Sequence, residues 1–241
     1  MIIPRKLVYF LHMSRRGGRE PYKKIYAWNS QIAYVAGVIA SDGCLSNNGR
    51  HLNVTSTDME MLENVRKILD LRVKIGTKRN GFGGFGNFIQ FGDVSLYDFL
   101  LKAGITPAKS KTILKVDVPD LYYGDFLRGL FDGDGTVYGY WDPRWRSSFM
   151  YYVGFISASI NFLHWISATN ERLVKTSPGK ISQMSRASVL RYAKSDSQKL
   201  FNLMYKNFNA PCLNRKRAKF VDFLKLDPYP DKALLARVAE R

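Results

Sequence analysis

Hydrophobic and polar positions follow the same order twice along the chain. In the first copy, an apolar segment at 32–40 ends in Ser41-Asp42-Gly43, and an alternating, strand-like stretch follows at 51–56. Apolar residues at helical spacing predict a helix over 58–69, with Asp58 as its N-cap. The remaining elements predicted for this copy are strands at 73–78 and 88–91 and a closing helix at 95–103.

The second copy repeats this order after a connection at 104–124 that contains two prolines. Its apolar segment, 125–132, ends in Gly133-Asp134-Gly135. The elements predicted after it are a strand at 150–157, a helix at 160–173, strands at 180–184 and 189–192, and a helix at 197–205. A plan that occurs twice indicates two structurally related halves.

The two apolar helices each have a face of small residues. Ala33, Gly37 and Ser41 share one side of the first helix because they are four residues apart. Gly129 and Gly133 occupy the positions of Gly37 and Ser41 in the second copy. Small residues allow two helix backbones to approach closely. The pattern therefore predicts that these two helices pack against each other.

An aspartate, Asp42 or Asp134, ends each of these helices just before a glycine. A carboxylate is unfavourable at a helix C-terminus because the helix dipole is negative there. If the helices pair, the two carboxylates also repel each other. A divalent cation between them removes both costs, and hard oxygen ligands suit magnesium. Two carboxylates that share metal ions are suited to phosphodiester hydrolysis.

The charge balance indicates a polyanionic partner. Lys and Arg number 37 against 20 Asp and Glu, which gives a formal charge of +17. No apolar run reaches the roughly 20 residues that a membrane span needs. The 2 cysteines form no disulfide framework, which indicates a reducing intracellular compartment: the cytoplasm or nucleoid of a prokaryote, or an organelle. The basic segment at 1–30 is typical of either a DNA-binding arm or a leader.

The two signatures, at 34–43 and 126–135, resemble those of single-chain LAGLIDADG homing endonucleases. The segments at 109–112 and 211–217 are also similar to members of that family, and the resemblance covers roughly residues 30–225. It implies an α+β fold of two pseudo-twofold-related αββαββα halves with antiparallel saddle sheets, packed through the two signature helices. The domains expected from the resemblance are a basic segment at 1–30, halves at 31–106 and 124–226, a linker at 107–123, and a tail at 227–241.

The resemblance implies magnesium-dependent cleavage of both DNA strands at a target of roughly 20 base pairs, leaving 3′ overhangs. Calcium and manganese are expected substitutes for magnesium, and the protein is expected to act as a monomer. The family's metal-binding acids fall on Asp42 and Asp134, and the carbonyls before them on Ser41 and Gly133. The lysine expected beside the metal falls on Lys194, with Asp93 at the matching place in the first half. At the edge of the active site, the resemblance points to Ser56 and Ser157.

Alternation along the predicted strands selects side chains that face the DNA. In the first half, these are Asn53, Thr55, Lys74, Lys78 and Gln90. In the second half, they are Lys180 and Arg191, and Lys109 in the linker joins the DNA-binding set. The strand at 150–157 is apolar or aromatic on both faces, which leaves its register open.

Two other functions remain open from the sequence. The first is an RNA-binding maturase that assists splicing of its own intron, since a basic surface serves RNA as well as DNA. The second is a non-catalytic DNA-binding regulator on the same fold, although a regulator is expected to lose one or both metal acids. Asp42 and Asp134 are both present.

Overall fold

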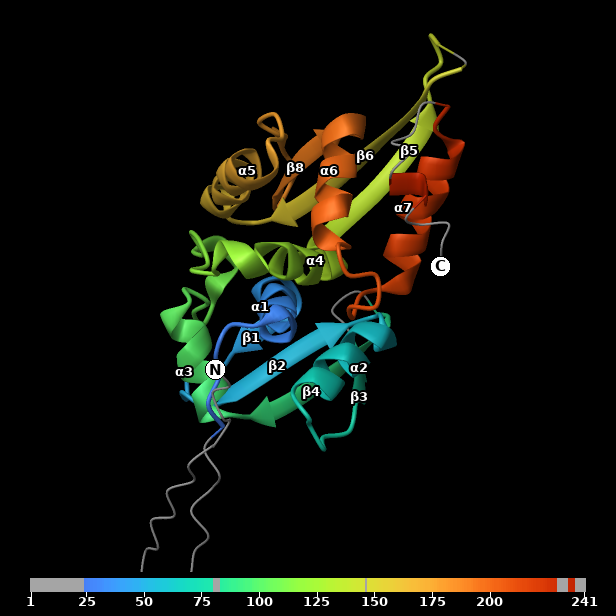
Figure 1. Cartoon of the computed structure of the whole chain (residues 1–241). Coiled ribbons are helices and arrows are strands. Elements are labelled where there is room, and N and C mark those ends of the chain that lie inside the picture. Colours follow the sequence, from blue (N-terminus) through green and yellow to red (C-terminus); the bar gives the residue numbers. More distant parts are fainter. Residues whose placement is uncertain (1–23, 80–82, 146, 229–233, 237–241) are drawn as a thin grey trace, which may run out of the picture.

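The computed structural model describes residues 24–79, 83–145, 147–228 and 234–236. Most of the basic N-terminal segment and of the C-terminal tail therefore lies outside the described residues. Figure 1 shows the two halves one above the other, with the two signature helices side by side at the centre. Among the described residues, no helix has the length and apolar character needed to cross a membrane.

The first half contains three helices and four strands in its described residues. Asn29 caps the first helix because its side chain accepts hydrogen bonds from Gln31 N and Ile32 N. The elements are α1 (Ser30–Asp42), β1 (Gly43–Leu45), β2 (His51–Ser56), α2 (Met59–Ile68), β3 (Gly76–Arg79), β4 (Phe85–Gly92) and α3 (Val94–Lys102). The strand predicted at 73–78 thus begins only at Gly76, which leaves Lys74 outside it.

The connection and the second half follow the same plan, with one helix added. The linker carries two short 3-10 helices, Lys109–Lys111 and Asp120–Tyr122. The second half consists of α4 (Tyr123–Asp134), β5 (Gly135–Trp141), β6 (Phe149–Ser157), α5 (Ile160–Val174), β7 (Lys180–Gln183), β8 (Ser188–Ala193), α6 (Lys194–Met204) and α7 (Asn214–Leu226). Hydrophobic periodicity did not predict α7, whose apolar face is narrow and whose first turn carries Arg215, Lys216 and Arg217.

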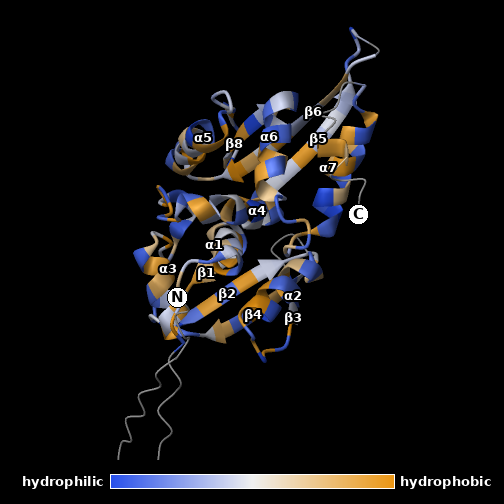
Figure 2. Ribbon diagram, in the orientation of Figure 1, coloured by the Kyte–Doolittle hydropathy of each residue, from blue (hydrophilic) through white to orange (hydrophobic). Residues whose placement is uncertain are grey.

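Both halves contain an antiparallel four-stranded sheet with the same order. The order is β1-β2-β4-β3 in the first sheet and β5-β6-β8-β7 in the second. Polar and apolar residues alternate along β2, as Figure 2 shows, and buried Leu52 and Val54 face the helices. The α+β fold with two related halves, expected from the sequence, is confirmed.

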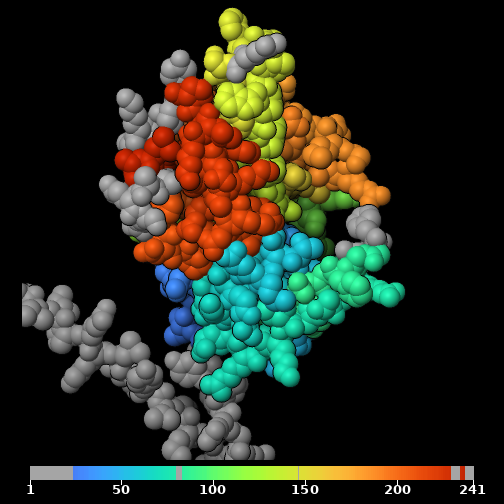
Figure 3. All heavy atoms as spheres, turned by 90° about the vertical axis from the view of Figure 1, so that its right-hand side faces the viewer, coloured from blue at the N-terminus to red at the C-terminus, as the bar shows by residue number. Residues whose placement is uncertain are grey.

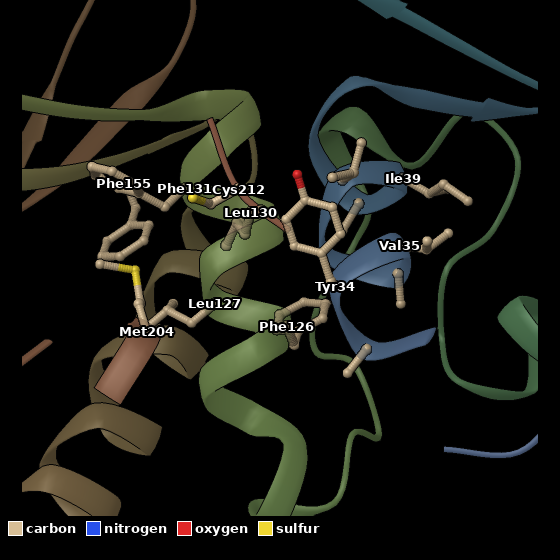
Figure 4. Close-up of a cluster of buried hydrophobic side chains, with 14 of the residues drawn as sticks. Tyr34, Val35, Ile39, Phe126, Leu127, Leu130, Phe131, Phe155, Met204 and Cys212 are labelled. Carbon is tan, nitrogen blue, oxygen red and sulfur yellow. The ribbon is translucent and has the colours of Figure 1, made fainter. Parts of the chain in front are cut away.

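The helices α1 and α4 pack on each other through backbone-to-backbone contacts at two glycines. A methyl group added to Gly37 would lie 2.1 Å from Phe126 O, and one added to Gly129 would lie 2.1 Å from Tyr34 O. Side chains beside these glycines fill the seam, and Figure 4 shows Tyr34 of α1 beside Phe126 and Leu130 of α4. The expectation that the two helices pair through their small residues is confirmed.

The start of α7 lies against the first half, as the red and cyan surfaces show in Figure 3. The Arg215 guanidinium donates to both carboxylate oxygens of Asp58, at 2.6 Å each. Asp58 stands at the N-cap position of α2, but its side chain makes no capping hydrogen bond. The predicted N-cap position of Asp58 is therefore confirmed, but its carboxylate joins the two halves instead of capping the helix.

Candidate active site at the helix ends

The two aspartates meet where α1 and α4 end side by side. A methyl group on Gly133 would lie 2.0 Å from Ser41 Oγ and 2.6 Å from Asp42 Oδ2, so the end of α1 touches the end of α4. Asp134 follows Gly133 directly, and both carboxylates are half-buried. The helix pairing therefore brings the two predicted metal acids together at one end of the seam.

The environment of these carboxylates opposes their ionisation. Burial, followed by repulsion from Asp134, raises the pKa of Asp42 to about 7. Burial also raises the pKa of Asp134 above its usual value. Two carboxylates that are destabilised by burial and proximity gain from a divalent cation, because it neutralises both charges at once.

Lys216 lies beneath the end of α4 and is buried. Its ammonium donates to four backbone oxygens: Phe131 O at 2.7 Å, Asp132 O at 2.8 Å, Gly133 O at 3.0 Å and Gly135 O at 2.7 Å. These include carbonyls that the last turn of a helix leaves without partners. Burial lowers the pKa of Lys216 to about 8, while its charge lowers the pKa values of Asp42 and Asp134.

Lys109 occupies the related place at the end of α1. It is also buried, and its ammonium donates to Gly43 O at 2.5 Å. Its charge, like that of Lys216, lowers the pKa values of Asp42 and Asp134. Lys109 therefore lies at the helix ends rather than on an uncovered sheet face, and its contact with DNA stays a prediction.

Lys194 does not reach the carboxylates. It begins α6, forms an ion pair with the buried Asp227 and lies over the Tyr151 ring at 6.0 Å from the centroid. The preceding residue, Ala193, pairs with Tyr152, and Tyr152 pairs with Tyr138, three residues beyond Gly135. Lys194 is therefore about 10 Å along the strands and two strand spacings away from the start of β5. The expected place of Lys194 beside Asp134 is wrong; Lys216 and Lys109 lie there.

Ser56 and Ser157 end the second strands of the two sheets, close to the helix ends. Gly43, the first residue of β1, pairs with Val54, and Gly135, the first residue of β5, pairs with Phe155. Each serine lies two residues after this partner along its own strand. Ser56 Oγ accepts a hydrogen bond from Asp58 N at 3.0 Å, and Ser157 Oγ accepts one from Ser159 N at 3.1 Å. Both hydroxyls therefore also shape the turn into the next helix.

The donor set at the helix ends fits a divalent cation with open coordination positions. The described residues contain no group of three or more His, Cys, Asp or Glu side chains placed to hold a metal ion. The two carboxylates leave room for water and phosphate oxygens, as magnesium sites at phosphates commonly do. Of the two expected carbonyl ligands, Gly133 O accepts a hydrogen bond from Lys216 at 3.0 Å.

The uncovered face of the first sheet is polar. Asn53 of β2 and the exposed Gln90 of β4 are direct neighbours in the strand register. Thr55 donates to the Asn53 side-chain oxygen at 2.9 Å. Lys78 lies over the Phe88 ring at 5.2 Å from the centroid. The structure thus brings four of the five predicted DNA-facing residues of this half onto one strand face.

The uncovered face of the second sheet combines aromatic and basic residues. Lys180 of β7 and Arg191 of β8 are neighbours in the register, as predicted for residues on one face. Tyr151 and Val153 of β6 are buried against the helices, so Met150, Tyr152 and Ile156 face outward. The structure therefore settles the register that the sequence left open.

Comparison with known proteins accords with this geometry. A family model described as a LAGLIDADG-like domain matches residues 29–81. The structure is similar to the homing endonuclease I-WcaI bound to its DNA recognition sequence, with a TM-score of 0.55, 14% identity, and coverage of 79% of this chain and 85% of that one. The chain has the two-domain LAGLIDADG fold.

Two further solved structures share the LAGLIDADG fold. The similarity to I-DmoI in complex with DNA and Ca has a TM-score of 0.51, 13% identity, and coverage of 79% of this chain and 97% of that one. Full-length DUF199/WhiA from Thermatoga maritima gives a TM-score of 0.55 at 11% identity and covers 88% of this chain. The chain spans only 65% of that protein. No curated protein sequence matches the chain.

Proposed function

We propose that the protein is a site-specific endonuclease that cuts both strands of a DNA duplex. The observation that carries this proposal is the pair of half-buried carboxylates, Asp42 and Asp134, at the adjacent ends of α1 and α4. Each half supplies one acid, as expected for an enzyme that treats two strands alike. A non-catalytic regulator has no need for two carboxylates that repel each other.

Asp42 and Asp134, with the carbonyl of Ser41, would hold magnesium or a substitute such as calcium or manganese. The metal would supply Lewis-acid stabilisation of the charge that develops on the phosphate. Lys216 acts as a positioning residue, because its four hydrogen bonds fix the end of α4. Lys109 has one hydrogen bond to a described residue, so its ammonium retains N–H groups for a phosphate oxygen or an ordered water.

The two uncovered sheet faces are suited to two half-sites of one duplex. Each sheet would follow about one turn of groove, which gives a target of roughly 20 base pairs. The charge of +17 supplies the attraction to phosphates. The similar structures that contain DNA support a duplex as partner. We propose that one chain binds the whole target as a monomer and leaves 3′ overhangs, as expected for intron homing.

The proposal is tested by selection and cleavage of a target. The full chain, with calcium present, is used to enrich duplexes from a randomised pool, and the enriched duplex is then transferred to magnesium. We expect a double-strand break at one position, and no break when a chelator replaces the metal. Enrichment of a duplex that magnesium leaves uncut would contradict the nuclease and favour a DNA-binding regulator.

A further inference from the structure

Three tyrosine rings form a stack on the uncovered face of the second sheet. The Tyr138 and Tyr152 rings are 5.2 Å apart at an interplanar angle of 16°, and the Tyr140 and Tyr152 rings are 6.0 Å apart at 19°. The Tyr140 and Tyr152 hydroxyls are 3.4 Å apart. Because the Tyr152 ring stacks with both neighbours, the central ring of the stack offers its edge and hydroxyl to a partner.

Apolar side chains accompany the stack. Met150 and Ile156 of β6 lie on the same outward face, and each is only partly buried. We define the tyrosine face as Tyr138, Tyr140, Met150, Tyr152 and Ile156. It begins close to the cleavage centre, because β5 starts directly after Asp134. In Figure 1, β5 and β6 extend well beyond the other strands of this sheet.

The surroundings of the tyrosine face are suited to a nucleic acid. Lys180 and Arg191 share the outward face of the same sheet and supply positive charge for phosphates. An antiparallel ribbon of two strands fits the major groove of B-form DNA. Side chains on one strand face repeat every two residues, about 6.7 Å, which matches about two base pairs at 3.4 Å each.

We propose that the tyrosine face reads thymine 5-methyl groups in the major groove of its half-site. This inference rests on the proposed function and names what the second half recognises. The thymine methyl is the one apolar group that bases present in that groove, and the tyrosine ring edges, Met150 and Ile156 supply its apolar complement. Duplex RNA is a poor match because its deep, narrow major groove excludes side chains. Single-stranded bases are a poorer match because they stack on free ring faces, and the central Tyr152 ring is stacked on both sides.

The first sheet provides an internal control. Its corresponding face carries the amides of Asn53 and Gln90, which suit hydrogen bonding to adenine N6 and N7 rather than contact with a methyl group. Removal of methyl groups should therefore affect the two half-sites unequally.

The experiment uses the full chain and the duplex enriched as described above. In one arm, deoxyuridine replaces thymidine in the first half-site only, and in the other arm in the second half-site only. A buried methyl group contributes about 0.8 kcal/mol, so each contacted thymine should weaken binding about fourfold when its methyl is lost. We expect this loss in one half-site and less than a twofold change in the other.

Protein variants assign the effect to the tyrosine face. In Tyr140→Ser/Met150→Ser, we expect the deoxyuridine penalty to decrease, because two of the five residues of the tyrosine face no longer offer apolar contact to the methyl groups. Tyr140 is 46% exposed, so this variant should fold, and its thermal melting curve checks that point. The matched control, Asn53→Ala/Gln90→Ala, should retain the penalty in full.

The outcomes separate the inference from the proposed function. Tolerance of deoxyuridine in both half-sites would overturn the inference, as would a penalty of unchanged size in Tyr140→Ser/Met150→Ser. Competition by unmodified RNA as strong as that of the selected duplex would also overturn it. A duplex that is bound with the expected methyl dependence but is not cut in magnesium would contradict the proposed nuclease activity and leave the inference intact.

Discussion

The ends of α1 and α4 carry the same carboxylate but are held differently. Lys216 donates to four carbonyls at the end of α4, whereas Lys109 donates to Gly43 O alone among the described residues at the end of α1. The two sheets also differ, because the uncovered face of the first carries amides and that of the second carries tyrosines. The two halves thus share the fold and the acids, whereas their lysine contacts and the residues on their uncovered sheet faces differ.

The largest expected effect concerns a feature that the two halves have in common, the close contact of α1 and α4 at Gly37 and Gly129. Gly37→Ala and Gly129→Ala each place a methyl group 2.1 Å from a carbonyl oxygen of the opposite helix. We expect each to lower the free energy of unfolding by about 3 kcal/mol or more, at the upper end of overpacking costs. Denaturant unfolding measures this, with Gly86→Ala as control, since a methyl group there meets only Thr55 Cγ2 at 3.8 Å. Equal stability of Gly37→Ala and Gly86→Ala would mean that the helices do not pack as described.

The second prediction tests whether the two lysines have different roles. Lys109→Met should slow single-turnover cleavage by about two to three powers of ten, the size typical of one preorganised charge, and should lose less stability than Lys216→Met because it leaves one carbonyl without its donor instead of four. Lys216→Met should in addition lower the melting temperature, because each buried carbonyl left unsatisfied costs about 1–3 kcal/mol. Lys194→Met is the matched control and should cut at the normal rate. Slow cleavage by Lys194→Met together with normal cleavage by Lys109→Met would reverse the assignment.

The third prediction concerns the pH dependence of stability without metal. The pKa of Asp42 in the folded state is about 7, above the ordinary value of 3.8 in the unfolded chain. Between pH 4 and 7, the folded state therefore holds a proton that the unfolded chain has released. The free energy of unfolding falls as the pH rises through that range. At pH 8 in a chelator, Asp42→Asn should be more stable than the natural protein by about 1–3 kcal/mol.

Magnesium should reverse this order, because a ligand of the folded state stabilises only the protein that binds it. Thermal melting of both proteins, with chelator and with magnesium, measures the change. If Asp42→Asn is the less stable protein in chelator, the carboxylates are not under the strain described here.

The smallest predicted effect separates a phosphate contact from a base contact. Arg191→Ala should reduce the slope of log affinity against log salt by about one, the change expected for one phosphate contact. Gln90→Ala should leave the slope unchanged and relax base preference at one position of its half-site. Binding titrations over a range of salt concentrations measure both slopes, and an equal decrease in the two variants would remove the distinction.

Most of the fold could be predicted from the sequence because it depends on local periodicity and on repetition. The small-residue face of Gly37 and Gly129 predicted the helix pairing, and this in turn predicted the meeting of Asp42 with Asp134. Alternation correctly placed Asn53 and Gln90 on one strand face. Each of these inferences needs only residues a few positions apart, or the same position in two copies.

The lysines could not be placed by the same reasoning. Lys109 lies in the linker two residues after Pro107, whereas Lys216 lies in the first turn of α7 five residues after Pro211, so their spacing does not reveal the repeat. Lys109 contacts a residue 66 positions away in the sequence, and Lys216 contacts residues 81 to 85 positions away, so tertiary packing sets both contacts. Lys194 follows a strand as expected, but the buried Asp227 holds it on the helical side of the sheet.

The central claim is that Asp42 and Asp134 each serve one strand of a shared cleavage site. The most direct measurement compares Asp42→Asn, Asp134→Asn and the natural protein on a supercoiled plasmid that carries the selected target, in magnesium, beside a binding titration. We predict that each variant loses double-strand cleavage while it binds the target with nearly unchanged affinity. Linear product from either variant at the natural rate would contradict the claim.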